Sequence, residues 1–324
     1  MPGKTFLDLS LTLRPARWAD LNAVAKLTHE VAEMEGDSLF VLTAEELANE
    51  WKSEGFDVER DVFVVENRDG RLVGSEEFYN ESGHHQLKAD GCVHPEFRGL
   101  GIGSSLLEKI AERAQAEMAL AAPGERVFIQ SLVNNKDEAG HTLLRNNGYA
   151  PVRYFWRMEI KLQEAPATVT FPDGIELRPF IKDEHAVLVW QADNEAFRDH
   201  WGSRERTYEE WSHGKFGNPN FDPTLWMVAW DGNQVAGFSH NRLRKGIGWI
   251  GTIAVRRPWR GKGLGTALMR HTFSEFYKRG MTTIGLGVDS ANLTGATRLY
   301  ERAGMYVAGE FAVYEKELRT GGSG

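Results

Sequence analysis

Several features that would assign this 324-residue chain to other protein classes are missing from it. A single cysteine, Cys92, excludes an internal disulfide. No apolar run approaches the roughly 18 residues that a membrane span needs, and the N-terminus MPGKTFLDLS lacks the apolar core of a secretory signal. The net charge of −8 provides no broad basic face for nucleic acid. We therefore expect a cytoplasmic protein that binds neither membranes nor nucleic acid.

Metal-binding spacings are also missing. Five potential ligands crowd one short span, His84, His85, Asp90, Cys92 and His94, but without C-x-x-C or H-x(3)-H spacing. Alternation along a strand would send their side chains to opposite faces. We therefore predict no metal site.

A glycine-rich turn stands out between Ile253 and Met269, in the string IAVRRPWRGKGLGTALM. The residues before it are β-branched and apolar, as in a strand, and those after it carry apolar side chains at helical spacing. Glycine allows a backbone with positive φ that lies close to a ligand. A turn that opens into a helix N-terminus also directs free amides at an anion. The stretch therefore predicts a phosphate-binding strand–turn–helix.

Three known kinds of pyrophosphate-binding loop have glycine patterns that can be compared with this turn. The P-loop string G-x-x-x-x-G-K-[ST] occurs nowhere in the chain, and the glycines run G-x-G-x-G instead of the dinucleotide pattern G-x-G-x-x-G. Arg260-x-x-Gly263-x-Gly265 resembles the R/Q-x-x-G-x-G/A loop of the GNAT superfamily of acetyl-CoA-dependent N-acetyltransferases.

The same turn occurs twice. RGLGIG from Arg98 precedes RGKGLG from Arg260 by 162 residues, and the flanking hairpins and closing segments repeat at similar displacements. A period of this length indicates duplicated domains and not a solenoid of short repeats. A length of 324 residues is also ordinary for two domains, each with its own core.

Each repeat shows the predicted order strand, two helices, three strands, helix, strand, helix, strand. This order and the GNAT resemblance together imply an α/β (α+β) fold with two tandem domains, each a mixed, mostly antiparallel sheet with helices on both faces. We place the N-terminal domain at 1–163, a linker at 164–173 where QEAPATVTFPDG loses periodicity, and the C-terminal domain at 174–318. Residues 319–324 are expected to form a flexible tail.

The resemblance implies an acetyl-CoA site in the C-terminal repeat and a counterpart in the first. In the family, backbone amides of the strand before the turn hold the pantetheine and the thioester oxygen, while the turn holds the diphosphate. The implied contacts in the C-terminal repeat are Ile253, Val255, Arg260, Gly261, Lys262, Gly263, Leu264, Gly265, Thr266 and Asn292. Those in the first repeat are Val93, Arg98, Gly99, Gly101, Gly103 and Ser104.

The catalytic acid implied by the resemblance is Tyr300. Asn292, Tyr300 and Gly304 match the family pattern N-x(7)-Y-x(3)-G, in which the phenol protonates the leaving thiolate. Alignment of Gly148 with Gly304 puts Leu144 at the equivalent place in the first repeat, and leucine cannot donate a proton. We therefore predict that the C-terminal domain is catalytic and the N-terminal domain is a degenerate copy. The alternative for Tyr300 is a core aromatic residue of a short helix.

The general base is less defined by the sequence. The strand before the turn carries no glutamate, so His240 on the adjoining strand is the candidate, because imidazole titrates near neutral pH. An ordinary half-buried histidine and a base acting through water remain alternatives. Asp199, His200 and Trp201 fall where the family's variable helices form the acceptor site.

The predicted function is transfer of an acetyl group from acetyl-CoA to a primary amine of a small molecule. The tandem architecture, with GVDSANLTGATRLYERAGM and DNEAFRDHWG, resembles the mycothiol-synthase-like branch of the family, but its glutamate on the pre-turn strand is missing here. Two alternatives remain, a non-catalytic acyl-CoA-binding or scaffold protein and a peptide or protein N-acetyltransferase. The oligomeric state is left open, and a monomer is plausible.

Overall fold

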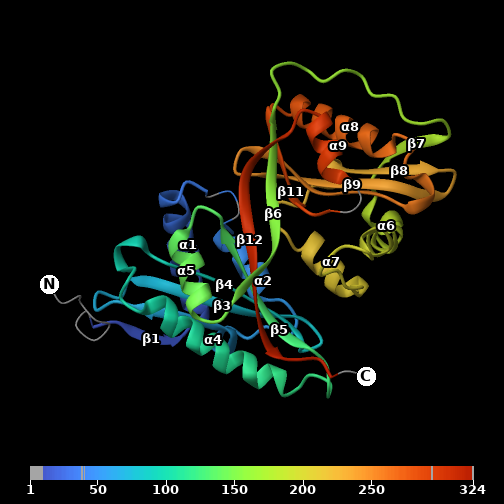
Figure 1. Cartoon of the computed structure of the whole chain (residues 1–324). Coiled ribbons are helices and arrows are strands. Elements are labelled where there is room, and N and C mark those ends of the chain that lie inside the picture. The colour runs from blue at the N-terminus through green and yellow to red at the C-terminus, as the bar shows by residue number, and fades with distance from the viewer. Residues whose placement is uncertain (1–9, 38, 40, 293–294, 323–324) are drawn as a thin grey trace. The chain divides into compact units, whose positions relative to one another are not determined.

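The structure is a computed structural model that describes residues 10–37, 39, 41–292 and 295–322. The chain forms two compact units, Met1–Arg153 with Phe311–Gly324 (unit 1) and Tyr154–Glu310 (unit 2). Figure 1 labels their helices and strands. Each unit is described by itself.

Unit 1 follows the strand and helix order expected of one repeat, with an additional short helix, α3. Its elements are β1 (Thr12–Pro15), α1 (Leu21–Met34), α2 (Ala44–Trp51), α3 (Val58–Asp61), β2 (Val62–Glu66), β3 (Leu72–Ser82), β4 (Gln86–Val93), α4 (Ile102–Met118), β5 (Val127–Asn134) and α5 (Glu138–Asn146). Thr43 caps α2 through the capping box with Glu46 that the sequence predicts. Helix α5 ends before Gly148, whose φ is 83°.

Unit 2 repeats this order. Its elements are β7 (Ile175–Pro179), α6 (Lys182–Phe197), α7 (Tyr208–Phe216), β8 (Trp226–Asp231), β9 (Gln234–Arg244), β10 (Ile247–Val255), α8 (Leu264–Lys278), β11 (Thr283–Asp289) and α9 (Ala296–Arg302). Thr207 and Glu210 form the second predicted capping box, at the start of α7.

The two closing strands are exchanged between the repeats. β6 (Ala150–Lys161), which ends the first repeat, pairs antiparallel with β11 of unit 2. β12 (Tyr306–Arg319), which ends the second, pairs antiparallel with β5 of unit 1. The strand order is therefore β1-β2-β3-β4-β5-β12 in unit 1 and β7-β8-β9-β10-β11-β6 in unit 2. Within these orders only β4–β5 and β10–β11 are parallel.

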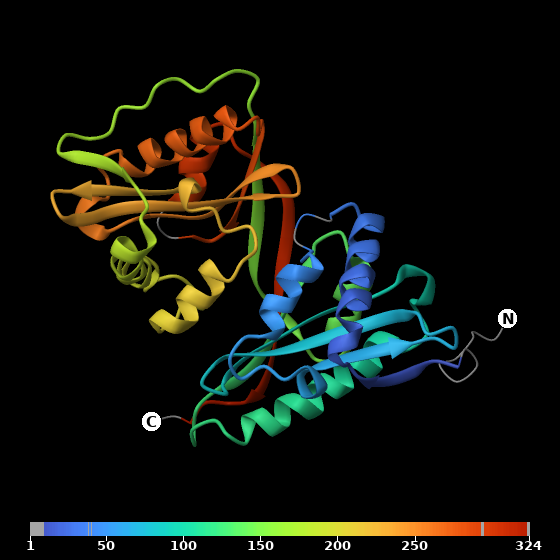
Figure 2. The ribbon, with the colours of Figure 1, turned by 180° about the vertical axis from the view of Figure 1, so that it is seen from behind.

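Helices cover both faces of each sheet. In unit 2, α8 and α9 lie on one face and α6 and α7 on the other (Figure 1). In unit 1, α1 and α2 lie on the face opposite α4, as the view from behind shows (Figure 2). Because each strand alternates its side chains between these faces, adjacent residues contribute to different cores. The predicted α/β fold with two tandem domains is confirmed.

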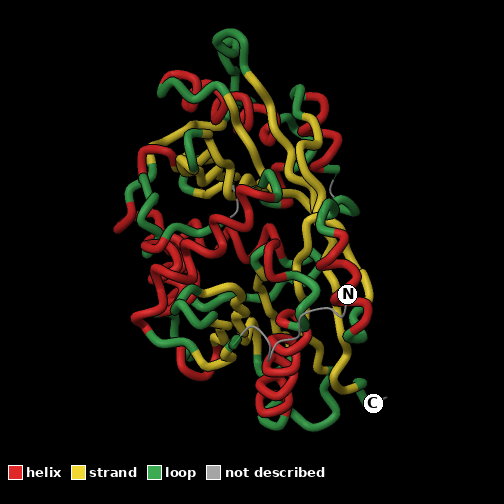
Figure 3. The backbone as a smooth tube through the Cα atoms, turned by 90° about the vertical axis from the view of Figure 1, so that its left-hand side faces the viewer, coloured by secondary structure: helices red, strands yellow, loops and turns green. Residues whose placement is uncertain are grey.

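The compact units do not follow the boundaries expected at 163 and 174. A linear boundary assumes that each repeat completes its own sheet, whereas here the residues after Arg153 and after Glu310 complete the sheet of the other repeat. Residues 162–174, which include the expected linker, contain no helix or strand and are drawn as loop in Figure 3. Residues 1–9 of the N-terminus and 323–324 of the expected tail lie outside the described residues.

Strand exchange predicts which fragments fold. Residues 1–163 lack β12, so β5 would be left as a bare edge and the core around buried Tyr314 would be open. We expect this fragment to aggregate or unfold. Residues 1–153 joined to 311–322 by a flexible Gly/Ser linker should give a cooperative thermal transition, followed by circular dichroism. Equal cooperativity of both fragments would contradict the structural importance of the exchange.

Candidate functional site

The central parallel strands of unit 2 separate from each other. Pairing between β10 and β11 is confined to Gly248–Ile250 with Ile284–Leu286, although β10 continues to Val255. The β9–β10 register also shifts between Ile250 and Thr252. Backbone groups along the β10 edge beyond Ile250 therefore lack a β11 partner, and buried backbone groups need one. This opening contains Ile253 and Val255, the strand positions predicted to contact the cofactor.

The glycine turn follows this opening directly. Gly261 and Gly263 have φ of 74° and 84°, and apart from their neighbours along the chain no atom lies within 4 Å of where their Cβ atoms would be. Gly263 is the N-cap of α8, with no side chain bonded to the helix end. The first-turn amides of Leu264, Gly265 and Thr266 therefore have no partner from the helix itself. Together with the positive end of the helix dipole, these amides fit a diphosphate.

Two of the four cations around this turn remain available to an anion. Arg256 forms an ion pair with Glu195, and Arg257 forms one with Asp199. Arg260 instead donates to the carbonyl oxygens of Val255 and Ala196, at 2.9 and 3.1 Å. Backbone carbonyls orient a guanidinium without neutralising it. Among the described residues, neither Arg260 nor Lys262 has a carboxylate partner.

The counterpart in unit 1 has the same backbone and a weaker charge. Gly99 and Gly101 have φ of 78° and 85°, and Gly101 is the N-cap of α4, before Ser104. Arg98, however, forms ion pairs with Glu35 and Asp137. A Cβ on Gly103 would lie 2.7 Å from the Leu143 side chain. Close packing against α5 is therefore enough to require glycine at this position. Val93 lies on the part of β4 that β5 no longer pairs.

Tyr300 lies on α9 and packs in an apolar cluster with Ile250, Ile253 and Leu286. It therefore lies beside the strand opening, on the α8/α9 face. Only 7% of the residue is exposed, and this burial raises the pKa of the phenol to about 12. No hydrogen-bond partner of its hydroxyl is found among the described residues. Tyr300 thus keeps its proton at neutral pH and has that proton available for a ligand.

His240 lies on the opposite face of the same opening, where it pairs with Thr252 of β10. Its ring is buried against Trp226, and Lys215 of α7 lies 2.8 Å from its Nε2. Burial and the adjacent Lys215 hold the pKa of His240 well below its usual value. The imidazole is therefore neutral, with Nε2 accepting from Lys215, and it is a poor base by itself.

Lys215 lies in no motif that would mark it in the sequence. It precedes Phe216 at the end of an aromatic-rich helix, and only the fold brings it to His240. Burial lowers the pKa of Lys215 to about 8, with Asp193 opposing the shift and Arg206 and Arg242 adding to it. An amine with this pKa exists partly as the free base near neutral pH.

The residues predicted to bind the acceptor contact side chains other than Lys215 and His240. Asp199 is exposed, and Arg257 holds the pKa of its carboxyl below the usual value. His200 Nε2 lies 3.4 Å from Asn292 Nδ2, and burial, with Arg260 nearby, lowers the pKa of the imidazole. Trp201 is exposed and packs against Phe155 of β6. Asp199 therefore already has a cationic partner.

Comparisons with known proteins agree with this geometry. Residues 186–305 match the acetyltransferase (GNAT) family model, and residues 59–151 match a GNAT acetyltransferase domain model. The chain is 31% identical over 221 residues to a mycothiol acetyltransferase of Thermobispora bispora, which covers 65% of this chain and 70% of that protein. A mycothiol acetyltransferase of Streptomyces scabiei is 28% identical, covering 76% and 75%.

Solved structures give the same result. A GCN5-related N-acetyltransferase from Sphaerobacter thermophilus superposes with a TM-score of 0.80 at 33% identity, covering 97% of this chain and 98% of that one. A tandem GNAT protein from the clavulanic acid biosynthesis pathway shares the fold, with a TM-score of 0.73 at 16% identity and coverage of 97% and 99%. The chain belongs to the GNAT family. It is an N-acetyltransferase with two GNAT domains in tandem, as the residues predicted, and not the non-catalytic alternative.

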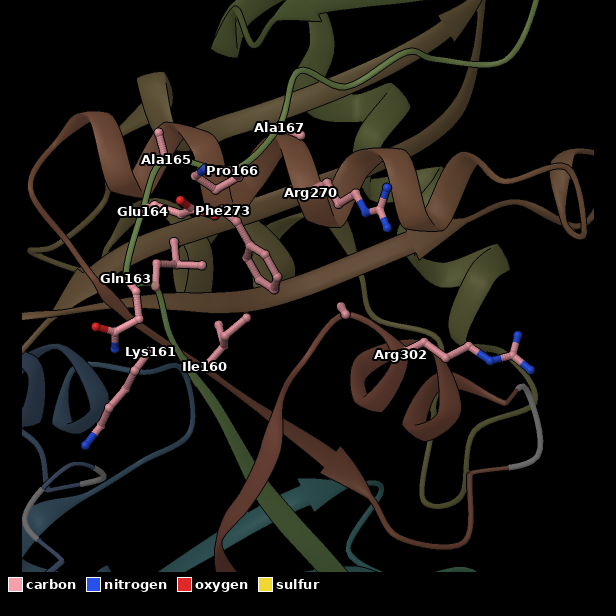
Figure 4. Close-up of a pocket in the computed structure, with 12 residues that line it drawn as sticks. Ile160, Lys161, Gln163, Glu164, Ala165, Pro166, Ala167, Arg270, Phe273 and Arg302 are labelled. Atoms are coloured by element: carbon pink, nitrogen blue, oxygen red, sulfur yellow. The ribbon is translucent and has the colours of Figure 1, made fainter.

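One further hollow of this GNAT enzyme lies in unit 2, on the α8/α9 side. It has a volume of about 470 Å³ between residues 160–167, α8 and α9, with Phe273 in its wall (Figure 4). None of the predicted site residues lines it. No helix in the described part of the chain is long and apolar enough to cross a membrane. No cluster of three or more His, Cys, Asp or Glu side chains placed for a metal ion occurs among the described residues.

The unequal charges of the two turns predict unequal anion binding. Arg260→Ala removes an unpaired guanidinium and should weaken binding of CoA to unit 2 by about tenfold, which corresponds to the ~1.4 kcal/mol scale of one charge-assisted hydrogen bond. Arg98→Ala removes a guanidinium that two carboxylates already neutralise, so its effect should be smaller. Calorimetry with CoA measures both. A larger loss in Arg98→Ala would reverse the ranking of the turns.

Proposed function

We propose that the enzyme transfers an acetyl group from acetyl-CoA to a primary amine of a small molecule, and that the chemistry takes place in unit 2. One observation carries this proposal. A protonated phenol and a low-pKa amine, Tyr300 and Lys215, lie on opposite faces of β10 where β11 departs from it. A proton donor and a proton acceptor on two sides of one opening suit acyl transfer between two substrates.

The residues of unit 2 fit CoA as a ligand. The amides of 264–266, with Arg260 and Lys262, would hold the diphosphate, and the unpaired β10 edge at Ile253 and Val255 would align the pantetheine arm. Acetyl-CoA supplies an activated acyl group as a thioester. A backbone N–H at this edge would then stabilise charge that develops on the acyl oxygen. Asn292, in the segment before α9, would also contact the bound CoA.

Tyr300 acts as the general acid in this proposal. Its phenol proton lies on the α8/α9 face, and its raised pKa keeps the group protonated until a stronger base forms beside it. A thiolate in water is a weaker base than this phenolate, so the proton transfer needs a thiolate that is held close and shielded from water, as the apolar cluster around Tyr300 provides.

Lys215 acts as the general base, and His240 positions it. The neutral imidazole accepts one Lys215 hydrogen and so fixes the amine, while leaving its lone pair for the proton of the incoming substrate. This assignment changes the role predicted for His240 from base to partner of the base. It also explains why the strand before the turn can lack a carboxylate.

The acceptor is proposed to enter on the α6/α7 side, past His200 and Trp201. Curated relatives are named mycothiol acetyltransferases, which supports a small-molecule amine as the acceptor. Since Arg257 already neutralises Asp199, an approaching amine would gain little from that carboxylate. We therefore expect uncharged amines to bind on this side about as well as amines that carry two positive charges.

Tyr300→Phe tests the acid. The change removes one oxygen that has no described partner, so the unfolding temperature should stay constant while kcat falls roughly 100-fold, the scale of general acid catalysis. Affinity for CoA should remain unchanged, because the phenol acts on the leaving group. Tyr277→Phe on α8 is the matched control. Unaltered turnover in Tyr300→Phe would remove the phenol from the mechanism.

Lys215→Met tests the base through the pH dependence of kcat. Lys215 must lose its proton to act, so kcat of the wild type should rise with pH and level off above about 8. The variant should lose this limb and roughly 100-fold in rate at pH 8. Lys278→Met, an exposed lysine on α8, should keep the wild-type profile. A persistent limb near pH 8 in Lys215→Met would assign the base elsewhere.

A further inference from the structure

Unit 1 contains two adjacent buried glutamates that the predicted mechanism leaves unused. Glu76 and Glu77 on β3 are each only 9% exposed. Because they are neighbours on a strand, their side chains point to opposite faces of the sheet. Burial of two carboxyl groups is costly unless they are paired or neutral, so their presence in a core strand needs an explanation.

Glu76 faces α4 and α5. On the same face of β3, Gly74 packs under Ile102 and Leu106 of α4, and the Phe78 ring lies under Arg113 of that helix. Glu76 pairs with Gly91 of β4, where a Cβ would lie 2.2 Å from its Oε2. Its carboxyl therefore occupies the space over an exposed glycine. No hydrogen-bond partner for it is found among the described residues.

Glu77 faces α1 and α2. Tyr79, two residues along the same face, donates its hydroxyl proton to the Glu77 carboxylate. The residue opposite Glu77 on β4 is Asp90, which Lys88 pairs at 2.8 Å. Glu77 is thus held by the hydrogen bond from Tyr79, with the Trp51 indole of α2 also directed at it, and a carboxylate keeps acceptor capacity for a further group.

Both glutamates lie where β4 leaves β5. The last parallel pair joins Lys88 to Gln130, whereas β4 continues to Val93, so Gly91 lies on the unpaired edge. The corresponding residues of unit 2 are Ser239, paired with Ile253, and His240, the partner of Lys215. Glu76 therefore lies on the face that corresponds to Tyr300, and Glu77 lies on the face that corresponds to Lys215.

The environments set different protonation states. Burial raises the pKa of Glu76 to about 8, with the charges of Asp90 and Glu77 adding to the shift. Burial raises the pKa of Glu77 to about 7. The hydrogen bond from Tyr79 and the Trp51 indole oppose this shift, the charge of Asp90 adds to it and the charge of Lys88 opposes it. Near neutral pH one carboxyl group keeps its proton and the other can accept one. Tyr149 also faces Glu76, and its own raised pKa keeps it uncharged.

We propose that unit 1 is a second acyl-transfer site, in which Glu77 accepts the proton of a primary amine and Glu76 protonates the departing thiolate of an acyl-CoA. The amine nitrogen attacks the thioester carbonyl carbon, so a C–N bond forms as the C–S bond breaks. The amine gives one proton to the Glu77 carboxylate, and the thiolate receives one from the Glu76 carboxyl. One proton then passes through solvent from Glu77 to Glu76, which restores both groups.

This site replaces the missing phenol of unit 1 by a carboxylic acid on another element. Leu144 stands where Tyr300 stands in unit 2 and cannot donate a proton. The neutral Glu76 carboxyl has a pKa close to that of a thiol, so proton transfer between the two is nearly balanced. An acceptor that arrives as an ammonium ion would first lose one proton to solvent, and the free amine then gives its second proton to Glu77 as the C–N bond forms.

The test uses the full chain with the unit 2 groups removed, Tyr300→Phe combined with Lys215→Met. Release of thiol from acetyl-CoA is followed with methylamine, ethanolamine, glucosamine and cysteamine S-methyl ether as probe amines. Amine-dependent release should remain in this double variant, at or below the roughly 1% of the wild-type rate that each single change in unit 2 leaves. Adding Glu77→Gln should lower it at least 100-fold, and adding Glu76→Gln should lower it at least tenfold. Glu81→Gln, an exposed carboxyl group on the same strand, should leave the rate unchanged.

A second measurement does not depend on turnover. Infrared difference spectra recorded on addition of CoA to the double variant should contain a protonated carboxyl band that Glu76→Gln abolishes and Glu81→Gln keeps. Absence of that band overturns the role of Glu76. Residual release that is insensitive to Glu77→Gln, or no release with any probe amine, overturns the second site.

These results separate this site from the proposed function of unit 2. If Glu77→Gln in the otherwise unchanged chain removes all activity while Tyr300→Phe and Lys215→Met have no effect, the chemistry lies in unit 1 alone. If Tyr300→Phe and Lys215→Met remove all activity while Glu77→Gln has no effect, unit 2 is the sole site. Additive losses indicate two working sites.

Discussion

The short parallel pairing at the centre of each sheet is the constraint on which the rest of the structure depends. In each unit the two central strands share three residue pairs and then part, although the strands themselves continue. Backbone N–H and C=O groups along the free edge must find other partners, because burying them unpaired is costly. A ligand with an extended amide-containing arm would satisfy them. The glycine turn and the helix start that follow the strand would then bind the charged end of the same ligand.

Within this shared frame the two units have diverged in charge and in proton donors. Among the residues that the structure describes, Arg260 and Lys262 of unit 2 have no carboxylate partner, whereas in unit 1 Glu35 and Asp137 neutralise Arg98. Conversely, unit 1 carries two buried carboxyl groups at the strand opening, where unit 2 carries a hydroxyl and a neutral imidazole. The duplication thus preserved the backbone of the strand opening and the glycine turn and changed the ionisable side chains beside them.

The sequence predicted those parts of the molecule that depend on local patterns. The repeat, the helix caps, the glycine turns and the place of Tyr300 on the last short helix all follow from spacing and from residue type. Lys215 and Glu76 could not be found in that way, since their altered pKa values arise from burial by elements distant in the chain. The exchange of the closing strands could not be predicted from the sequence either. β6 and β12 have similar apolar patterns, so neither the pattern nor the length indicates which sheet each one completes.

Packing volumes explain why the exchanged arrangement is preferred over the linear one. Tyr314 of β12 lies opposite Ser131, three residues before the end of β5, and packs in the same core as Leu144. Met158 of β6 lies opposite Leu286, three residues before the end of β11, and packs with Tyr300. Each pair of corresponding positions, Tyr314 with Leu144 and Tyr300 with Met158, therefore combines one tyrosine with one smaller apolar side chain.

Returning each strand to its own repeat would put Tyr300 and Tyr314 together in one core, and Leu144 with Met158 in the other. The first core would be overpacked and the second would contain a cavity, and each defect typically costs about 1–5 kcal/mol. The His141 ring, 3.0 Å from the Tyr314 hydroxyl, would also lose its buried partner to a thioether. The tyrosine that we propose as the general acid of unit 2 is thus accommodated because Tyr314 of the same repeat fills the core of unit 1 instead.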